Sequence, residues 1–152
     1  MVELGHVALR VSELERAIDF YQKAVGLKIV GRIGGGRAAL LTGGRQHHEL
    51  LLAAAPSMDA GASPRQPLYH VAWRVGEGLD ALRAAKDRLD RIGCPIEGAV
   101  DHGVSWSLYL RDPDSNQVEL FADNPGVDWR RSSEWLNAPS LPLDLTSAGA
   151  CA

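Results

Sequence analysis

The sequence contains few cysteines and no large excess of either charge, and each shortage excludes a class of protein. Its only two cysteines, Cys94 and Cys151, fit neither a disulfide framework nor a CxxC zinc site. The 16 lysines and arginines are interspersed with 19 acidic residues, which gives a formal net charge of −3. The chain therefore lacks the basic stripe that binding to nucleic acid or to a membrane surface requires.

Long hydrophobic runs are also absent, since no apolar stretch approaches the roughly 20 residues of a membrane-spanning helix. Residues 1–25 have the pattern of a strand followed by a helix rather than that of a signal peptide. We therefore expect a soluble cytoplasmic protein. Its 152 residues suit a single compact domain.

An internal repeat is the main feature of the chain. Residues 6–11 and 70–75 are identical at five of six positions, at an offset of 64 residues (70 − 6). Residues 49–51 recur in similar form as 119–121, at an offset of 70 residues (119 − 49). Two independent matches at similar offsets predict two copies of a unit of roughly 60 residues.

Hydrophobic periodicity predicts the same elements in both copies. The first copy reads as strand 4–11, a helix from Leu14 to a glycine stop at Gly26, and strands 28–33, 37–42 and 46–55. The second reads as strand 68–75, helix 79–92, and strands 96–100, 105–111 and 117–122. The sequence thus predicts an α+β fold in which two tandem βαβββ modules form a curved mixed-sheet cup. Ser12 followed by Glu15 predicts a capping box at the start of the first helix.

The two modules occupy about residues 4–55 and 68–122 of one domain. A connector rich in proline, glycine and serine, residues 56–67, joins them. After residue 122 the periodicity is lost, and we expect the tail, residues 123–152, to wrap the body through its tryptophans.

The repeat places four candidate metal ligands at equivalent positions on the concave face of the cup: His6, Glu49, His70 and Glu119. Imidazole and carboxylate ligands suit iron, manganese, nickel or zinc, and two histidines with one carboxylate form the ligand set of ferrous oxygenases. The alternative interpretation is that these are four unrelated strand residues, each hydrogen-bonded within the core. Their recurrence in both copies favours a metal site.

Four strings resemble the vicinal oxygen chelate superfamily, which includes glyoxalase I, extradiol ring-cleaving dioxygenases, fosfomycin resistance enzymes and bleomycin-binding proteins. They are residues 5–11, 17–21, 26–27 and 112–120. The segments 109–114 and 121–125, followed by Trp129, also resemble short catechol 2,3-dioxygenase-like proteins of bacteria. Ser115 replaces the usual glycine of the turn at 112–116, which costs little if Ser115 avoids a positive φ.

The resemblance to extradiol dioxygenases implies a function for several residues. It implies that His6, His70 and Glu119 hold the metal, with Fe(II) favoured over Mn(II), Ni(II) or Zn(II). Tyr109, ten residues before Glu119, would contact a substrate oxygen, and His102 resembles a histidine near the ligands.

His47 resembles the acid/base residue of these enzymes, which lies two residues before the position of Glu49. Strand alternation would place His47 and Glu49 on one face and His48 on the other, so we interpret His48 as structural. The resemblance thus predicts an extradiol-type ring-cleaving dioxygenase that acts on a catechol-like small molecule, as a homodimer.

Two alternatives remain open from the sequence. A glyoxalase I-like lyase or isomerase would use all four ligands, with Glu49 as the fourth. A metal-free resistance protein would bind a flat antibiotic between aromatic walls, for which Trp73, Trp106 and Tyr109 are the candidates.

Overall fold

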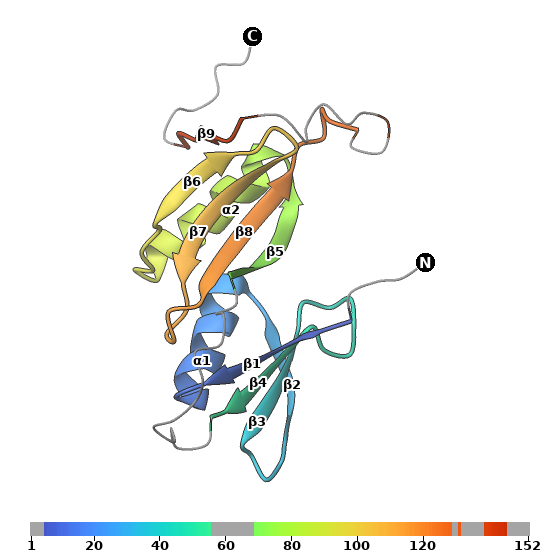
Figure 1. Cartoon of the computed structure of the whole chain (residues 1–152), viewed down its shortest axis with the longest axis vertical. Helices are drawn as coiled ribbons and strands as arrows, with labels where there is room; N and C mark the ends of the chain where they lie inside the picture. The colour runs from blue at the N-terminus through green and yellow to red at the C-terminus, as the bar shows by residue number, and fades with distance from the viewer. Residues whose placement is uncertain (1–4, 56–68, 129–130, 132–138, 146–152) are drawn as a thin grey trace. The chain divides into compact units, whose positions relative to one another are not determined.

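The computed structural model describes residues 5–55, 69–128, 131 and 139–145, and the chain divides into two compact units (Figure 1). The first unit comprises residues 1–68 and 112–116, and the second comprises residues 69–111 and 117–152. The predicted connector, and Trp129 and Trp135 of the tail, lie outside the described residues. No helix within the described ranges is long and apolar enough to cross a membrane.

The first unit contains a four-stranded mixed sheet and one helical segment. Its elements are β1 (Val7–Val11), α1 (Leu14–Phe20), the π-helical turn η1 (Tyr21–Val25), β2 (Lys28–Ile33), β3 (Ala38–Thr42) and β4 (Leu50–Ala54). The strand order is β1-β4-β3-β2, with β1 parallel to β4 and the other pairs antiparallel. Gly26, at φ +92°, ends the helical segment at the predicted stop.

The second unit repeats this topology and adds one edge strand. Its elements are β5 (His70–Glu77), α2 (Gly78–Arg91), β6 (Gly98–Asp101), β7 (Ser105–Arg111), β8 (Gln117–Asp123) and β9 (Leu141–Pro142). The order is β5-β8-β7-β6-β9, with β5 parallel to β8. The predicted α+β fold with two βαβββ modules is confirmed, whereas β9 comes from the tail and was not predicted.

Strand alternation decides which side chains form the core of the second unit. One face of β7 and β8 is at most 1% exposed: Leu108, Leu110, Val118, Leu120 and Ala122. Helix α2 covers this face with its own buried residues, Leu82, Ala85 and Leu89 (Figure 1). Burying each leucine contributes about 1.5–3 kcal/mol, so this face determines the orientation of both strands. The intervening residues therefore project from the opposite face of the sheet.

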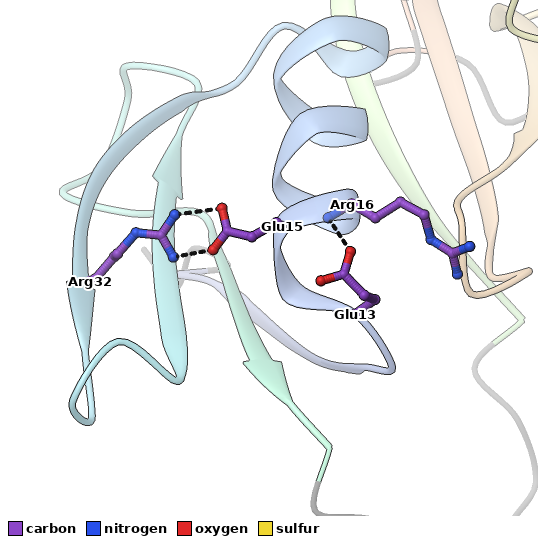
Figure 2. Close-up of polar contacts among 4 residues, drawn as sticks. All are labelled: Glu13, Glu15, Arg16 and Arg32. Carbon is purple, nitrogen blue, oxygen red and sulfur yellow. Dashed lines mark hydrogen bonds and ion pairs between the residues drawn. The ribbon is translucent and has the colours of Figure 1, made fainter.

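The first helix begins with a different cap from the predicted one. Glu13 is the N-cap, and its carboxylate accepts a hydrogen bond from the Arg16 amide at 2.9 Å (Figure 2). Glu15, the predicted partner of Ser12, instead forms a two-pronged ion pair with Arg32 of β2, at 2.7 and 2.8 Å. The capping-box prediction is wrong because the planar guanidinium of Arg32 offers Glu15 two parallel hydrogen bonds.

The turn that joins β7 to β8 belongs to the first unit, and Asp112 holds it together. One oxygen of the Asp112 carboxylate accepts hydrogen bonds from the amides of Asp114 and Asn116, at 2.9 and 2.8 Å. The other accepts a hydrogen bond from the buried Tyr21 hydroxyl at 3.0 Å. Burial, and then the charge of Asp112, raise the pKa of Tyr21 far above its ordinary value. The phenol therefore stays a hydrogen-bond donor.

Ser115 in this turn adopts a left-handed conformation. Its φ is +65°, and it is the only non-glycine residue with a positive φ in the described part of the chain. Ser115 thus does not avoid a positive φ, and the replacement of glycine by serine at this position costs stability. A side chain in this region costs roughly 1–2 kcal/mol.

Ser115→Gly should raise the free energy of unfolding by up to about 1 kcal/mol, because relief of the left-handed strain exceeds the added chain entropy of glycine. Urea denaturation of both proteins measures the difference. Ser115→Ala is the matched control, because alanine keeps the Cβ that causes the strain. Equal stabilisation by both substitutions would contradict this explanation.

Candidate active site

Three neighbouring strands of the second unit, β5, β8 and β7, present predicted site residues on one face. Glu119 of β8 pairs with Ala72 of β5 on one side and with Tyr109 of β7 on the other. His70 lies two residues before Ala72, so alternation places it on the same face as Glu119. The strand register thus brings His70, Glu119 and Tyr109 to one face of the sheet.

Glu119 carries a buried carboxylate, and each of its oxygens lies within hydrogen-bond distance of a side chain on a neighbouring strand. Glu119 is only 8% exposed and Ser107 is fully buried. The Ser107 hydroxyl donates to Oε1 at 2.5 Å, and Oε2 lies 3.2 Å from His70 Nε2. A buried carboxylate is costly without partners, so these contacts hold it in place. Ser107 was not predicted as a site residue, although its position two residues before Tyr109 places it on the same strand face.

The two nitrogens of the His70 ring differ in their surroundings. Its Nδ1 is buried and has no hydrogen-bond partner among the described residues. In a neutral imidazole one nitrogen carries the proton. The proton of His70 is therefore best placed on Nε2, where Glu119 accepts it.

Tyr109 and His102 form a second hydrogen-bonded pair. His102 lies in the turn between β6 and β7, and its Nε2 is 2.9 Å from the Tyr109 hydroxyl oxygen. Burial raises the pKa of Tyr109 to about 12, with further contributions from the charge of Glu119 and a hydrogen bond to it. The phenol is therefore protonated near neutral pH and can donate a hydrogen bond.

The spacing of His70 and Glu119 fits two ligands of one metal ion. Nitrogen and oxygen ligands lie roughly 2.0–2.2 Å from such an ion, so adjacent ligands are roughly 2.8–3.6 Å apart. The separation of 3.2 Å between His70 Nε2 and Glu119 Oε2 falls in this range. The described residues contain no group of three histidine, cysteine, aspartate or glutamate side chains able to hold a metal. His6 belongs to the first unit, and its part as third ligand stays a prediction.

Three histidines of the first unit contact one another. The ring centroids of His6 and His48 are 4.5 Å apart, and so are those of His47 and His48. Burial, and repulsion from His47 and His6, lower the pKa of His48. Because β4 begins only at Leu50, strand alternation does not separate His47 from His48. The contact of His48 with the predicted ligand His6 was therefore not predicted.

Glu49 anchors the turn that precedes β4. Its Oε2 accepts hydrogen bonds from the Thr42 hydroxyl and the Gly43 amide, at 2.8 and 2.7 Å. Its Oε1 accepts hydrogen bonds from the amides of Arg45 and Gln46, at 3.1 and 3.2 Å. Burial raises the pKa of Glu49, but these hydrogen bonds outweigh it and lower the pKa below its ordinary value. The strand starts later than predicted because this turn uses the residues before it.

The register of the strands shifts the expected equivalence between the two units. Glu119 pairs with Ala72, whose repeat counterpart is Ala8. Ala8 pairs with Leu51 and not with Glu49. The predicted equivalence of Glu49 and Glu119 is therefore wrong by two residues. The run of three leucines after Glu49 allowed a sequence match in the wrong register, and an even shift preserves the strand face.

Comparisons with known proteins agree with this fold. The family model described as "Glyoxalase/Bleomycin resistance protein/Dioxygenase superfamily" matches residues 3–120. A catechol-2,3-dioxygenase of Bacillus subtilis (strain 168) is 35% identical over 134 residues, which are 86% of this chain and 45% of that protein. A lactoylglutathione lyase of Neisseria meningitidis serogroup A is 27% identical over 132 residues, which are 84% of this chain and 95% of the lyase.

Among solved structures, a glyoxylase/bleomycin resistance protein/dioxygenase domain from Frankia sp. EAN1pec has a TM-score of 0.65 at 19% identity. The match covers 87% of this chain and 99% of that domain. The chain thus spans less than half the length of the dioxygenase and nearly the whole length of the lyase.

Glu49→Gln should lower the free energy of unfolding by about 1–3 kcal/mol at pH 7, because it replaces a charged acceptor of four hydrogen bonds and leaves donors unpaired. The folded-state pKa of Glu49 is below its unfolded value. Its contribution is therefore fully present above the unfolded pKa of about 4.3 and is lost as the pH falls through the folded value.

Urea denaturation at pH 7 and near pH 3 measures both effects. The loss caused by Glu49→Gln should be smaller at the lower pH. The control is Glu97→Gln, which removes a surface partner of Arg111 and should change stability far less. An equal effect of the two substitutions would show that Glu49 does not anchor its turn.

Proposed function

The chain belongs to the glyoxalase/bleomycin resistance protein/dioxygenase superfamily, and from this premise we propose that it is a metal-dependent enzyme that opens the ring of a catechol-like substrate. The reaction we propose is extradiol cleavage with Fe(II) as the metal. The similarity to a catechol-2,3-dioxygenase supports this class of reaction.

The observation that carries the proposal is the arrangement of His70, Glu119, Tyr109 and His102 in the second unit. Ring cleavage requires a metal position and, beside it, a group that donates a hydrogen bond to the substrate oxygen. His70 and Glu119 have the spacing of two metal ligands, and the strand partner of Glu119 is a protonated phenol. Three adjacent strands thus carry residues suited to both requirements, which supports the proposal.

His70 Nε2 and Glu119 Oε2 would hold the metal ion, with His6 as the third ligand. Bound ferrous iron supplies the open coordination positions and the redox chemistry that the reaction of a catechol with dioxygen requires. To act as a ligand, His70 Nε2 gives up its proton. Ser107 continues to hold the other oxygen of Glu119, which keeps the carboxylate in one orientation.

The remaining residues act on the substrate and its protons. The Tyr109 hydroxyl would donate to one catechol oxygen, and His102 keeps the phenol in place at 2.9 Å. His47 is the predicted proton donor and acceptor. The contact of His48 with His6 makes His48 a second candidate for this role.

A glyoxalase I-like lyase is the alternative function, and the similarity to nearly the whole length of a lactoylglutathione lyase favours it. That function requires Glu49 as a fourth ligand. In the first unit the Glu49 carboxylate accepts four hydrogen bonds from its own turn, and Leu51 occupies the position that corresponds to Glu119. Both observations favour a three-ligand site.

Metal analysis of the purified protein should find stoichiometric divalent metal, because His70 and Glu119 are preorganised at ligand spacing. His70→Ala and Glu119→Ala should each remove the metal, whereas Glu49→Ala should retain it. Circular dichroism confirms that each variant is folded. Retention of metal by Glu119→Ala would contradict the ligand assignment, and a wild-type protein that takes up no metal would support the metal-free binding protein instead.

Tyr109→Phe should lower ring-cleavage turnover of the iron-loaded protein by about 10²- to 10⁴-fold without changing its iron content, because it removes one positioned donor. Oxygen consumption with a panel of catechols measures the rate. The matched control is Tyr69→Phe, since Tyr69 is 80% exposed and the substitution also removes only a hydroxyl. His47→Ala and His48→Ala, assayed together, identify which histidine transfers the proton.

A different result would replace the proposed reaction. If iron-loaded protein leaves every catechol unchanged, while nickel- or zinc-loaded protein converts methylglyoxal and glutathione in a Glu49-dependent manner, the chain is a lyase. In that case Tyr109→Phe would lose its expected effect on turnover.

A further inference from the structure

The edge strand β9 brings a serine of the tail to the candidate site. The Ser140 hydroxyl oxygen is 3.0 Å from His102 Nδ1, and the other ring nitrogen of His102 lies 2.9 Å from the Tyr109 hydroxyl oxygen. Ser140 immediately precedes β9, which pairs with β6 through Leu141 and Pro142. His102 thus lies between the tail and the phenol.

The backbone on both sides of His102 is held in place. The His102 amide donates to the Ser105 carbonyl at 2.9 Å within the turn between β6 and β7. The side-chain amide of Asn124 donates to the Gly103 carbonyl at 2.7 Å. On the tail side, the Leu143 amide donates to the Ala99 carbonyl at 3.0 Å. The contact between Ser140 and His102 therefore joins two anchored segments.

The two contacts of His102 determine its tautomer jointly. A neutral imidazole has one donor and one acceptor nitrogen, so the distances fit two arrangements. If Nδ1 carries the proton, it donates to the Ser140 oxygen, and the Tyr109 hydroxyl must donate its only proton to Nε2. If Nε2 carries the proton, it donates to the Tyr109 oxygen, and the Ser140 hydroxyl donates to Nδ1.

The surroundings of Tyr109 select the second arrangement. Glu119 is the strand partner of Tyr109, and the negative charge of its buried carboxylate contributes to the raised pKa of the phenol. A carboxylate only accepts hydrogen bonds and attracts the phenol proton, so the Tyr109 hydroxyl is oriented with its proton toward Glu119. His102 must then donate to the Tyr109 oxygen from Nε2, and Nδ1 must accept from Ser140. The hydrogen bonds then all run in one direction: Ser140 donates to His102, His102 donates to Tyr109, and the Tyr109 proton faces Glu119.

We propose that Ser140 is a positioning residue, which holds His102 in the Nε2-protonated tautomer and so leaves the Tyr109 proton available to an oxygen of the substrate. The tautomer follows from the contacts of this chain, and its use in catalysis rests on the proposed function. The short strand β9 contributes to this arrangement, because its pairing with β6 fixes the position of Ser140.

Nuclear magnetic resonance of the metal-free protein with 15N-labelled histidine tests the tautomer without any assay of activity. The protonated and unprotonated ring nitrogens have well-separated shifts, and the His102 signals are assigned by their loss in His102→Gln. Wild-type His102 should be protonated at Nε2. Ser140→Ala should shift the population toward Nδ1 protonation, and Ser140→Thr should restore the wild-type signals. The control is Leu141→Ala, which alters β9 and keeps the hydroxyl, so its His102 signals should match the wild type.

Turnover of the iron-loaded protein provides the second measurement. Ser140→Ala should lower kcat by about 3- to 10-fold, as expected for one neutral hydrogen bond, with KM nearly unchanged and with rescue by Ser140→Thr. Protonation of wild-type His102 at Nδ1, or His102 signals that do not respond to Ser140→Ala, would overturn the proposal. Failure of ring cleavage alone, with the expected tautomer change present, would refute the proposed function and the catalytic part of this inference, but not the positioning of His102 by Ser140.

Discussion

The burial of the Glu119 carboxylate is the constraint on which the polar face of the second unit depends. An unpaired charge at this position would cost several kcal/mol, so the neighbouring strands must supply partners. Ser107 and Tyr109 of β7 and His70 of β5 supply them. The same contacts set a nitrogen and an oxygen at metal-ligand spacing, so the stability of this face and the geometry of the candidate site depend on one side chain.

The two units use glutamate for different purposes. Glu119 lies within a strand, and its surroundings leave one oxygen facing a histidine. Glu49 lies just before a strand, and the hydrogen bonds of a turn occupy both of its oxygens. Identical side chains in related sequence strings therefore have different chemistry, because their position relative to the strand determines which groups reach them.

Contacts between segments far apart in the sequence complete both units. Asp112 in the turn after β7 accepts a hydrogen bond from Tyr21, which lies 91 residues earlier in the chain. Ser140 reaches His102 across 38 residues. Such contacts link elements whose own hydrophobic patterns are independent of each other, so a local pattern does not reveal them.

The sequence by itself determined the repeated βαβββ order of the two units and the glycine stop of the first helix. These follow from local rules: period-2 alternation, the helical period and the length of a hairpin connection. Only the tertiary structure decided the cap of α1, because Glu15 pairs with Arg32 instead of forming the predicted capping box with Ser12. It also decided the strand register, which places Leu51 rather than Glu49 opposite Ala8. Leucine runs satisfy more than one register, and hydrogen-bond partners are chosen by distance in space, which the order of residues does not contain.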